Sequence, residues 1–286
     1  MENSNYLVDT TAGRFILTLY EKRVSADDLP FFLQLLDHLA DRGNLVPRAL
    51  PDREGRTIQE LEGRPACLIE FLPGVSLSHP TAPQARAAAR ALGRMHASLA
   101  DFPLERGNAL GADAWAPLLG RCGTDLDDIA PGLFARVEGA LAEVLASWPA
   151  EGALPHSAIH ADLFPDNVLM LGDDVTGLID FYFACTDLRA YDLAVMHGAW
   201  TFDGDGAPAD PAVGQALMQG YEEAFGLSEA ERRALPVLAR GACIRFLLTR
   251  AWDWLNTPAD ALVTRKDPLA YLRRLDWYEN NRNAFA

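Results

Sequence analysis

One stretch of the sequence, residues 160–167, constrains this chain more than any other. It reads His-Ala-Asp-Leu-Phe-Pro-Asp-Asn, and an apolar run at 175–179 that ends in Asp180 follows after a Gly-Asp-Asp turn. Short apolar runs on either side of such a turn predict a β-hairpin. Asp162 can act as a general base, whereas Asn167 and Asp180 offer oxygen atoms of the kind that Mg²⁺ prefers. The stretch therefore predicts a hairpin that gathers a base and two metal ligands.

The spacing of these residues matches the catalytic loop of kinases. In that loop an Asp accepts the proton of the substrate hydroxyl, and an Asn five residues later holds Mg²⁺. Asp162 and Asn167 have this spacing, and Asp180 stands where kinases keep a second Mg²⁺ ligand. We name His160 beside Asp162 as a catalytic residue, chiefly as a brace of the loop through backbone hydrogen bonds. A single Asp or His is most often a turn former, but the combination predicts phosphoryl transfer.

Composition and charge limit the other classes of function. The chain has 286 residues, of which 49% are apolar and 23% charged, as is ordinary for a globular enzyme. A formal net charge of −15 argues against a nucleic-acid or anionic-membrane partner. The sequence shows neither a long apolar run that would span a membrane nor a secretion signal at its start. The four cysteines are far apart, so a reducing cytoplasm is the expected location.

The order of the predicted elements divides the chain into two parts. The first is expected to be mainly β, with strands at 4–9 and 14–21, a helix at 25–43 and two strands around residues 62–64. The motif Phe-Leu-Pro-Gly at 71–74 breaks this pattern. We therefore expect a nucleotide-binding lobe at 1–73 and a helical catalytic and substrate lobe at 74–286. Helices are predicted at 83–100, 132–148, 188–202, 211–225, 228–256 and 267–280.

Further motifs resemble one group of proteins. The stretch 160–180, with Phe-Tyr-Phe-Ala-Cys at 181–185 and Tyr-Asp-Leu-Ala at 191–194, is similar to the aminoglycoside-phosphotransferase-like kinases. Within that group, shorter signatures resemble the homoserine kinases, and they lie at 2–6, 17–23, 71–74, 244–247, 252–254 and 266–268. The resemblance spans nearly the whole chain. It implies an α+β, bilobal protein-kinase-like fold, with a small antiparallel β lobe and a larger, mainly α lobe.

The resemblance also implies an activity, which is the ATP- and Mg²⁺-dependent phosphorylation of L-homoserine to O-phospho-L-homoserine for threonine biosynthesis. It implies a small-molecule substrate and a monomer or homodimer, and Asp192 resembles a structural Asp that steadies the catalytic loop. One alternative is a kinase for an aminoglycoside, choline or an amino alcohol. The net charge keeps the aminoglycoside open, and Trp252 and Trp254 are available for a choline cage. The other alternative is an inactive kinase-like binding protein.

Two departures from the family pattern concern phosphate binding. The chain begins in what resembles the second half of the phosphate-covering loop, so the first strand of the small lobe is expected to be missing. Asn3, Ser4 and Asn5 are then the predicted backbone donors to the phosphates of ATP. Thr18 stands where many related kinases have Lys, and Lys22 on the same strand face is the predicted replacement. The alternative is that Lys22 only ends an exposed strand.

The nucleotide base and the acceptor give the remaining predictions. The base is expected at the crossover between the lobes, beside Glu70 and Phe71. Homoserine carries a carboxylate and an ammonium group, so its site should offer an Arg fork and an acid. Arg245 on the predicted helix 228–256 and Asp187 just after the hairpin are the predicted substrate residues. An Arg on a long helix often only joins two helices, and that alternative stays open.

Overall fold

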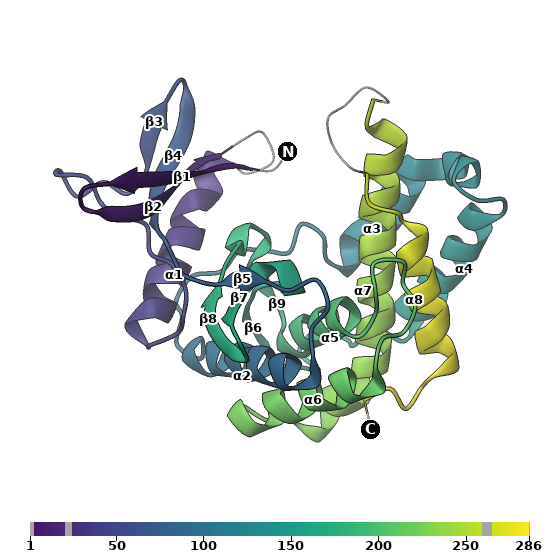
Figure 1. Cartoon of the computed structure of the whole chain (residues 1–286). Helices are drawn as coiled ribbons and strands as arrows, with labels where there is room; N and C mark the ends of the chain where they lie inside the picture. Colours follow the sequence, from purple (N-terminus) through teal and green to yellow (C-terminus); the bar gives the residue numbers. More distant parts are fainter. Residues whose placement is uncertain (1–2, 21–24, 259–264, 286) are drawn as a thin grey trace.

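The computed structural model describes residues 3–20, 25–258 and 265–285 and has two lobes (Figure 1). The small lobe is a four-stranded antiparallel sheet in the order β1, β2, β4, β3, with helix α1 (Leu29–Asp41) connecting it to the rest of the molecule. Its strands are β1 (Asn3–Thr10), β2 (Gly13–Tyr20), β3 (Gln59–Leu61) and β4 (Arg64–Glu70). The bilobal α+β fold predicted from the sequence is confirmed.

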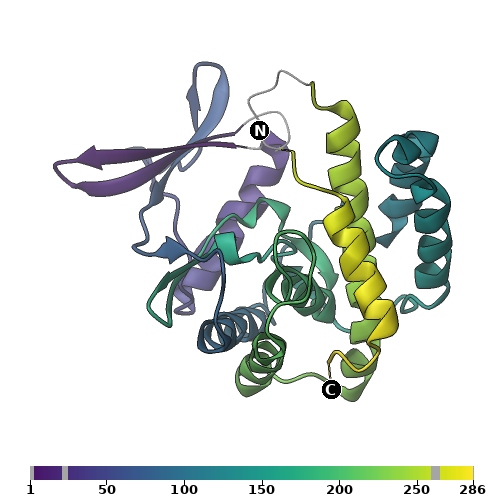
Figure 2. The ribbon, with the colours of Figure 1, turned by 45° about the vertical axis from the view of Figure 1, so that its right-hand side comes forward.

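The large lobe surrounds two small sheets with helices. One sheet pairs β5 (Val75–Ser76), β7 (Val168–Leu171) and β8 (Asp174–Leu178), and the other pairs β6 (His156–Ile159) with β9 (Cys185–Leu188). Helices α7 and α8 run side by side along one flank (Figure 2). The helices are α2 (Ala82–Ser98), α3 (Ala112–Cys122), α4 (Leu133–Ala146), α5 (Arg189–Trp200), α6 (Pro211–Ala224), α7 (Glu229–Asn256) and α8 (Leu269–Asn280).

Most predicted elements are confirmed to within two residues at each end, but α3 was missed and α1 begins late. The segment of α3 contains Pro117 between Gly111 and Gly120, a composition that indicates a loop. It is helical because Trp115 and Leu119 are buried in the core. The division after residue 73 falls between β4 and β5, and it stays a prediction. Among the described helices, none is long and apolar enough to cross a membrane.

Helix α2 lies close to α6 because glycines remove side chains from their contact. A Cβ atom on Gly220 would clash with the backbone carbonyl of Arg86. This close approach lets the ring of His96 on α2 accept a hydrogen bond from the hydroxyl of Tyr221, at 2.8 Å. The other ring nitrogen of His96 donates to Asp192 at 3.2 Å. Helix packing thus completes a buried polar network beneath the loop that begins at His160.

A second buried histidine predicts how stability depends on pH. Burial lowers the pKa of His197 on α5 to about 3, and its ring contacts the hydroxyl of Tyr278 at 2.6 Å. An unfolded histidine takes up a proton near pH 6.5, so the unfolded state binds more protons as the pH falls below that value. We expect His197 to lower the free energy of unfolding by about 2 kcal/mol between pH 7 and pH 5.

Urea denaturation at pH 7 and pH 5 measures this effect. In the His197→Asn variant, the loss of stability between the two pH values should be about 2 kcal/mol smaller than in the unchanged chain. An equal loss in both proteins would show that His197 is not neutral in the folded state.

Candidate active site

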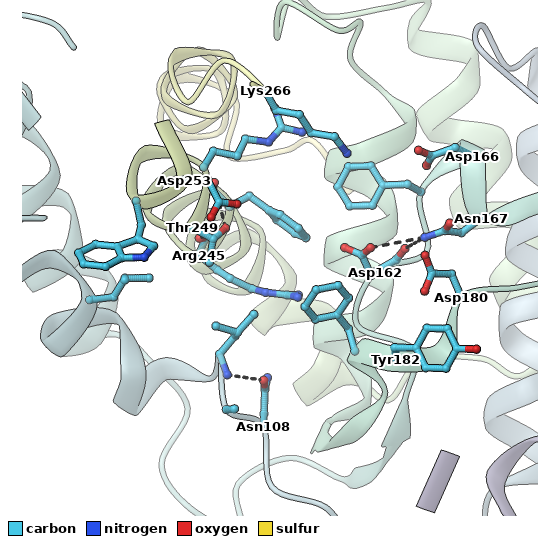
Figure 3. Close-up of a pocket in the computed structure, with 18 of the residues that line it drawn as sticks. Asn108, Asp162, Asp166, Asn167, Asp180, Tyr182, Arg245, Thr249, Asp253 and Lys266 are labelled. Carbon is cyan, nitrogen blue, oxygen red and sulfur yellow. Dashed lines mark hydrogen bonds between the residues drawn. The ribbon is translucent and has the colours of Figure 1, made fainter. Parts of the chain in front are cut away.

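The predicted hairpin brings the base and the two metal ligands together. Asn167 directly precedes β7, and Asp180 follows two residues after β8. The backbone amide of Ile179 donates to the carbonyl of Asn167 at 3.0 Å, which ties the two ends of the hairpin to each other. The amide nitrogen of Asn167 donates to the backbone carbonyl of Asp162 at 2.8 Å. All three predicted residues line one pocket of about 520 Å³ (Figure 3).

A buried carboxylate holds the loop that carries Asp162. The side chain of Asp192 accepts the backbone amides of His160 at 2.7 Å and of Ala161 at 2.8 Å, and it is fully buried. Burial raises the pKa of the Asp192 carboxyl, but the hydrogen bonds from His96 and from the loop outweigh it, so the pKa lies below its usual value. The predicted structural role of Asp192 is confirmed.

Ala161 adopts a backbone conformation that few residues with a side chain adopt. Its φ angle is +62°, in the left-handed region. Its amide donates to Asp192, and its carbonyl accepts a hydrogen bond from the guanidinium of Arg245. Bonds on both sides of the residue hold this strained conformation, as is common where a chain places a functional side chain. The next residue, Asp162, is thereby directed into the pocket.

His160 braces the loop and does not reach the pocket. Its ring is buried; Nε2 donates to the carbonyl of Ile179 at 2.9 Å, and Nδ1 accepts the amide of Asp162 at 3.3 Å. The acceptor role of Nδ1 requires the neutral ring, and burial lowers the pKa of His160. The side chain therefore links the catalytic loop to the end of the hairpin, as the brace predicted from the sequence. Both ring nitrogens are occupied by these contacts, so the structure gives no support for proton transfer by His160.

The donor set of Asn167 and Asp180 fits a divalent metal that also binds phosphates. The amide nitrogen of Asn167 is used by Asp162, which leaves the side-chain oxygen for a cation. Asp180 is exposed and has a φ of +64°. Among the described residues, no three His, Cys, Asp or Glu side chains gather to hold a metal by themselves. Mg²⁺ suits such a site, because it is usually held by one or two protein oxygens together with water and phosphates.

The pocket is richer in positive charge than the chain as a whole. Its wall has five cationic and four acidic side chains, whereas the whole chain has a net charge of −15. The cations are Arg106, Arg121, Arg245, Arg250 and Lys266, and the acids are Asp162, Asp166, Asp180 and Asp253. Local charge of this kind favours ligands that carry anionic groups.

The two residues predicted to hold the acceptor differ in position. Arg245 lines the pocket but is only 2% exposed, and its guanidinium lies over the ring of Phe246 at 4.4 Å. Asp187 is not among the pocket residues; it accepts the side-chain amide of Asn108 and the backbone amide of Leu188, both at 2.6 Å. Asp187 is therefore connected to the pocket lining through Asn108. A direct role of either residue in substrate binding stays a prediction.

The predicted phosphate donors lie in a strand. Asn3, Ser4 and Asn5 belong to β1 and pair with β2, so they are not in a loop, and none of them lines the pocket. The hydroxyl of Thr18 is buried and donates to the side chain of Asn5 at 2.8 Å. Lys22 falls outside the described residues. The phosphate-binding roles remain predictions.

The residues predicted beside the nucleotide base lie at the end of β4. The carboxylate of Glu70 accepts the backbone amide of Arg48 at 3.0 Å, and the ring of Phe71 lies 5.9 Å from the guanidinium of Arg14. Neither lines the pocket, and their role also remains a prediction. The lobes contact each other elsewhere, where the hydroxyls of Tyr20 on β2 and Tyr182 after the hairpin lie 3.3 Å apart.

Several pocket residues were not predicted from the sequence. Asn108 comes from the loop before α3, Arg250 and Asp253 from α7, and Lys266 from the segment before α8. The charged residues of α7 had one detectable signal, since they interrupt the otherwise apolar and aromatic run 246–254. Lys266 lies in the signature at 266–268 that resembles the homoserine kinases, whereas no local pattern distinguishes Asn108.

Comparisons with known proteins agree with this geometry. A model of the phosphotransferase enzyme family, APH, matches residues 1–234. A curated homoserine kinase from Gluconacetobacter diazotrophicus is 53% identical over 283 residues, which cover 99% of this chain and 88% of the relative. A homoserine kinase from Gluconobacter oxydans is 52% identical over 280 residues, with coverage of 98% and 88%.

Solved structures share the fold at low sequence identity. The amicoumacin kinase hAmiN in complex with AMP-PNP, Ca²⁺ and Ami has a TM-score of 0.73 at 14% identity, covering 98% of this chain and 86% of the other. A choline kinase from Cryptosporidium parvum has a TM-score of 0.68 at 13% identity, with coverage of 99% and 87%. Because a phosphotransferase model matches most of the chain and relatives of more than 50% identity span nearly all of it, the chain belongs to the phosphotransferase enzyme family.

Proposed function

We propose that this chain transfers the γ-phosphoryl group of ATP to the side-chain hydroxyl of L-homoserine, with Mg²⁺, to make O-phospho-L-homoserine for threonine biosynthesis. The proposal depends above all on one observation. Asp162, Asn167 and Asp180 line a single pocket whose lining also includes five cationic side chains. Relatives of 53% and 52% identity that are named homoserine kinases support the choice of acceptor.

The chemistry follows from the positions of these side chains. The carboxylate of Asp162 orients the acceptor hydroxyl and accepts its proton as the hydroxyl oxygen attacks the γ-phosphorus. Asn167 and Asp180 would hold Mg²⁺, which supplies charge neutralisation at the phosphate oxygens. Asp192 and His160 keep the loop rigid, so that the hydroxyl meets the phosphoryl group in line.

The wall of the pocket supports an acceptor with an anionic group over the other candidates. An aminoglycoside carries several positive charges and would need an acidic cleft, whereas cations outnumber acids in this wall. A choline acceptor would need free aromatic faces. The guanidinium of Arg121 lies 4.0 Å from the ring centre of Trp252, and that of Arg265 lies 4.7 Å from Trp254. Protein cations thus already occupy the proposed cage.

A coupled assay of ADP release tests the proposal. The purified chain is given ATP and Mg²⁺ with L-homoserine, L-serine, choline or kanamycin as the acceptor. We expect kcat/KM for L-homoserine to exceed that for each other acceptor by at least about 100-fold, because a site that pairs with every polar group of its substrate rejects analogues that leave those groups unpaired. Equal or greater turnover of another acceptor would overturn the choice of homoserine, and ADP release with none of them would overturn the proposed activity.

The four cysteines bear on the proposed location. Cys67, Cys122, Cys185 and Cys243 are all buried free thiols. Free thiols persist in a reducing compartment, which supports the cytoplasm as the place where the chain acts.

A further inference from the structure

Arg250 is a partly buried cation of the pocket wall, and its only hydrogen bond among the described residues goes to a backbone carbonyl, although the carboxylates of Asp162 and Asp267 lie near enough to attract its charge. Its guanidinium lies over the ring of Tyr271 at 4.6 Å and donates one long hydrogen bond, of 3.3 Å, to the backbone carbonyl of Asp267. The carboxylate of Asp267 is bound instead by Arg273 at 2.8 Å. A guanidinium has five N–H donors, so most of the hydrogen-bonding capacity of Arg250 has no described protein acceptor.

The surroundings of Arg250 favour the binding of an anion beside its guanidinium. The guanidinium of Arg274 lies over the same Tyr271 ring, at 4.3 Å, and donates to the backbone carbonyls of Gly198 and Asp203. Two cations thus share one ring. Burial lowers the pKa of Arg250, because the charged form has lost hydration that the nearby Tyr271, Asp162 and Asp267 replace only in part. A ligand with a carboxylate would supply the missing acceptor bidentately.

Three of the other four pocket cations are engaged in different ways, whereas Lys266 is exposed to solvent with its ammonium 5.9 Å from the ring centre of Phe164. Arg106 pairs with Asp28 at 2.7 Å, Arg245 donates to the carbonyl of Ala161, and Arg121 is an exposed side chain against Trp252. Arg245 was the residue predicted from the sequence for the carboxylate. Its burial and its bond to Ala161 make it a support of the catalytic loop.

An acid stands beside Arg250 on the same helix. Asp253 follows three residues later on α7, and residues at this spacing lie on one helix face. Both line the pocket together with Asp162. Figure 3 shows Asp253 and Thr249 on the wall opposite the group formed by Asp162, Asn167 and Asp180. One turn of α7 therefore offers a cation and an anion to the pocket that the base also lines.

We infer that Arg250 and Asp253 together bind the α-carboxylate and the α-ammonium group of an amino-acid acceptor, and so direct its side-chain hydroxyl toward Asp162. This inference rests on the proposed function and names the residues that select the acceptor. The carboxylate and the ammonium group of the acceptor match the opposite charges of Arg250 and Asp253, and its hydroxyl matches Asp162, which accepts the proton.

Acceptors that each lack one charged group test the inference. 3-Aminopropan-1-ol is homoserine without its carboxylate, and 4-hydroxybutyrate is homoserine without its ammonium group. In the Arg250→Gln variant, we expect kcat/KM to fall about 100-fold for L-homoserine and for 4-hydroxybutyrate, and to change less than about threefold for 3-aminopropan-1-ol. In Asp253→Asn the pattern should reverse: kcat/KM should fall for 3-aminopropan-1-ol and L-homoserine and stay nearly unchanged for 4-hydroxybutyrate. For an analogue that turns over too slowly, the inhibition constant against L-homoserine is measured.

Two further variants control for charge and folding. Arg233→Gln removes the same charge from an exposed site on α7, where Arg233 pairs with Glu229, and it should leave all acceptors unchanged. Arg250→Lys keeps the positive charge but not the planar guanidinium, so its kcat/KM for L-homoserine should fall less than that of Arg250→Gln. Thermal unfolding of each variant shows that it is folded.

Three outcomes would overturn the inference. An equal fall for all acceptors in Arg250→Gln would show that Arg250 acts on ATP or on the fold. An unchanged kcat/KM for L-homoserine in Arg250→Gln would show that another group binds the carboxylate. An unchanged kcat/KM for 3-aminopropan-1-ol in Asp253→Asn would show that another group binds the ammonium. Failure of the unchanged chain to phosphorylate L-homoserine is a different result, because it would overturn the proposed function itself.

Discussion

Replacing Asp162 with asparagine is expected to lower kcat for phosphoryl transfer by roughly 10²- to 10⁴-fold while the chain stays folded. Asparagine has nearly the same shape but cannot accept the proton of the acceptor hydroxyl. The shorter hydrogen bond from Asn167, of 2.8 Å, goes to the backbone carbonyl of residue 162 and survives the substitution. The longer one, of 3.4 Å, goes to the Asp162 carboxylate, and the side-chain oxygen of asparagine can still accept it. Steady-state ADP release measures kcat, and far-UV circular dichroism with thermal unfolding measures the fold.

A matched variant separates the base from a general effect of charge. Asp173 is an exposed acid in the turn of the same hairpin, and Asp173→Asn makes the same chemical change away from the pocket. Its kcat should stay within about twofold of the unchanged chain, since surface substitutions seldom disturb a fold. If Asp162→Asn retained near-normal kcat, Asp162 would not be the base.

Replacing Asp192 with alanine is expected to be the most destabilising single change at the site. The carboxylate is fully buried and accepts the amides of His160 and Ala161 and the ring N–H of His96. Alanine leaves three buried donors without an acceptor, and breaking such a buried charged network costs about 3–5 kcal/mol. Urea denaturation at pH 7 measures the loss, and phosphoryl transfer should fall with it because the loop before Asp162 loses its support.

The Asp192→Asn variant refines this prediction. Asparagine keeps one side-chain oxygen that can accept a backbone amide, but its NH₂ group cannot replace the second oxygen. We expect the free energy of unfolding of Asp192→Asn to lie between that of the unchanged chain and that of Asp192→Ala. A loss below about 1 kcal/mol in Asp192→Ala would mean that water or another group replaces the carboxylate, and the network would then not hold the loop.

The catalytic core of the site was predictable because it is local. Asp162, Asn167 and Asp180 lie within nineteen consecutive residues, and a hairpin with a short turn necessarily brings its two ends together. Alternating and apolar runs also indicated most strands and helices. Helix α3 was missed because Pro117 and the neighbouring glycines suggest a loop, whereas burial of Trp115 decides the outcome.

The acceptor side of the pocket was less predictable because its residues come from separate parts of the chain. Arg245 and Arg250 lie five residues apart on one helix, yet Arg245 is engaged by the catalytic loop and Arg250 is left with unused donors. Asp187 does not line the pocket, whereas Asn108 from a distant loop lines it and donates to Asp187. Neither difference follows from helical or strand periodicity.

By itself, the amino-acid sequence determined the hairpin, the three residues that it brings into one pocket, and the bilobal fold, because each depends on patterns within short segments or on likeness to a family. Only the tertiary structure decided which charged side chains are neutralised by the protein and which remain for a ligand. Charges act through space, and their partners, such as Asp192 for the loop at His160 and Asp267 for Arg273, are brought near by the packing of helices far apart in the chain.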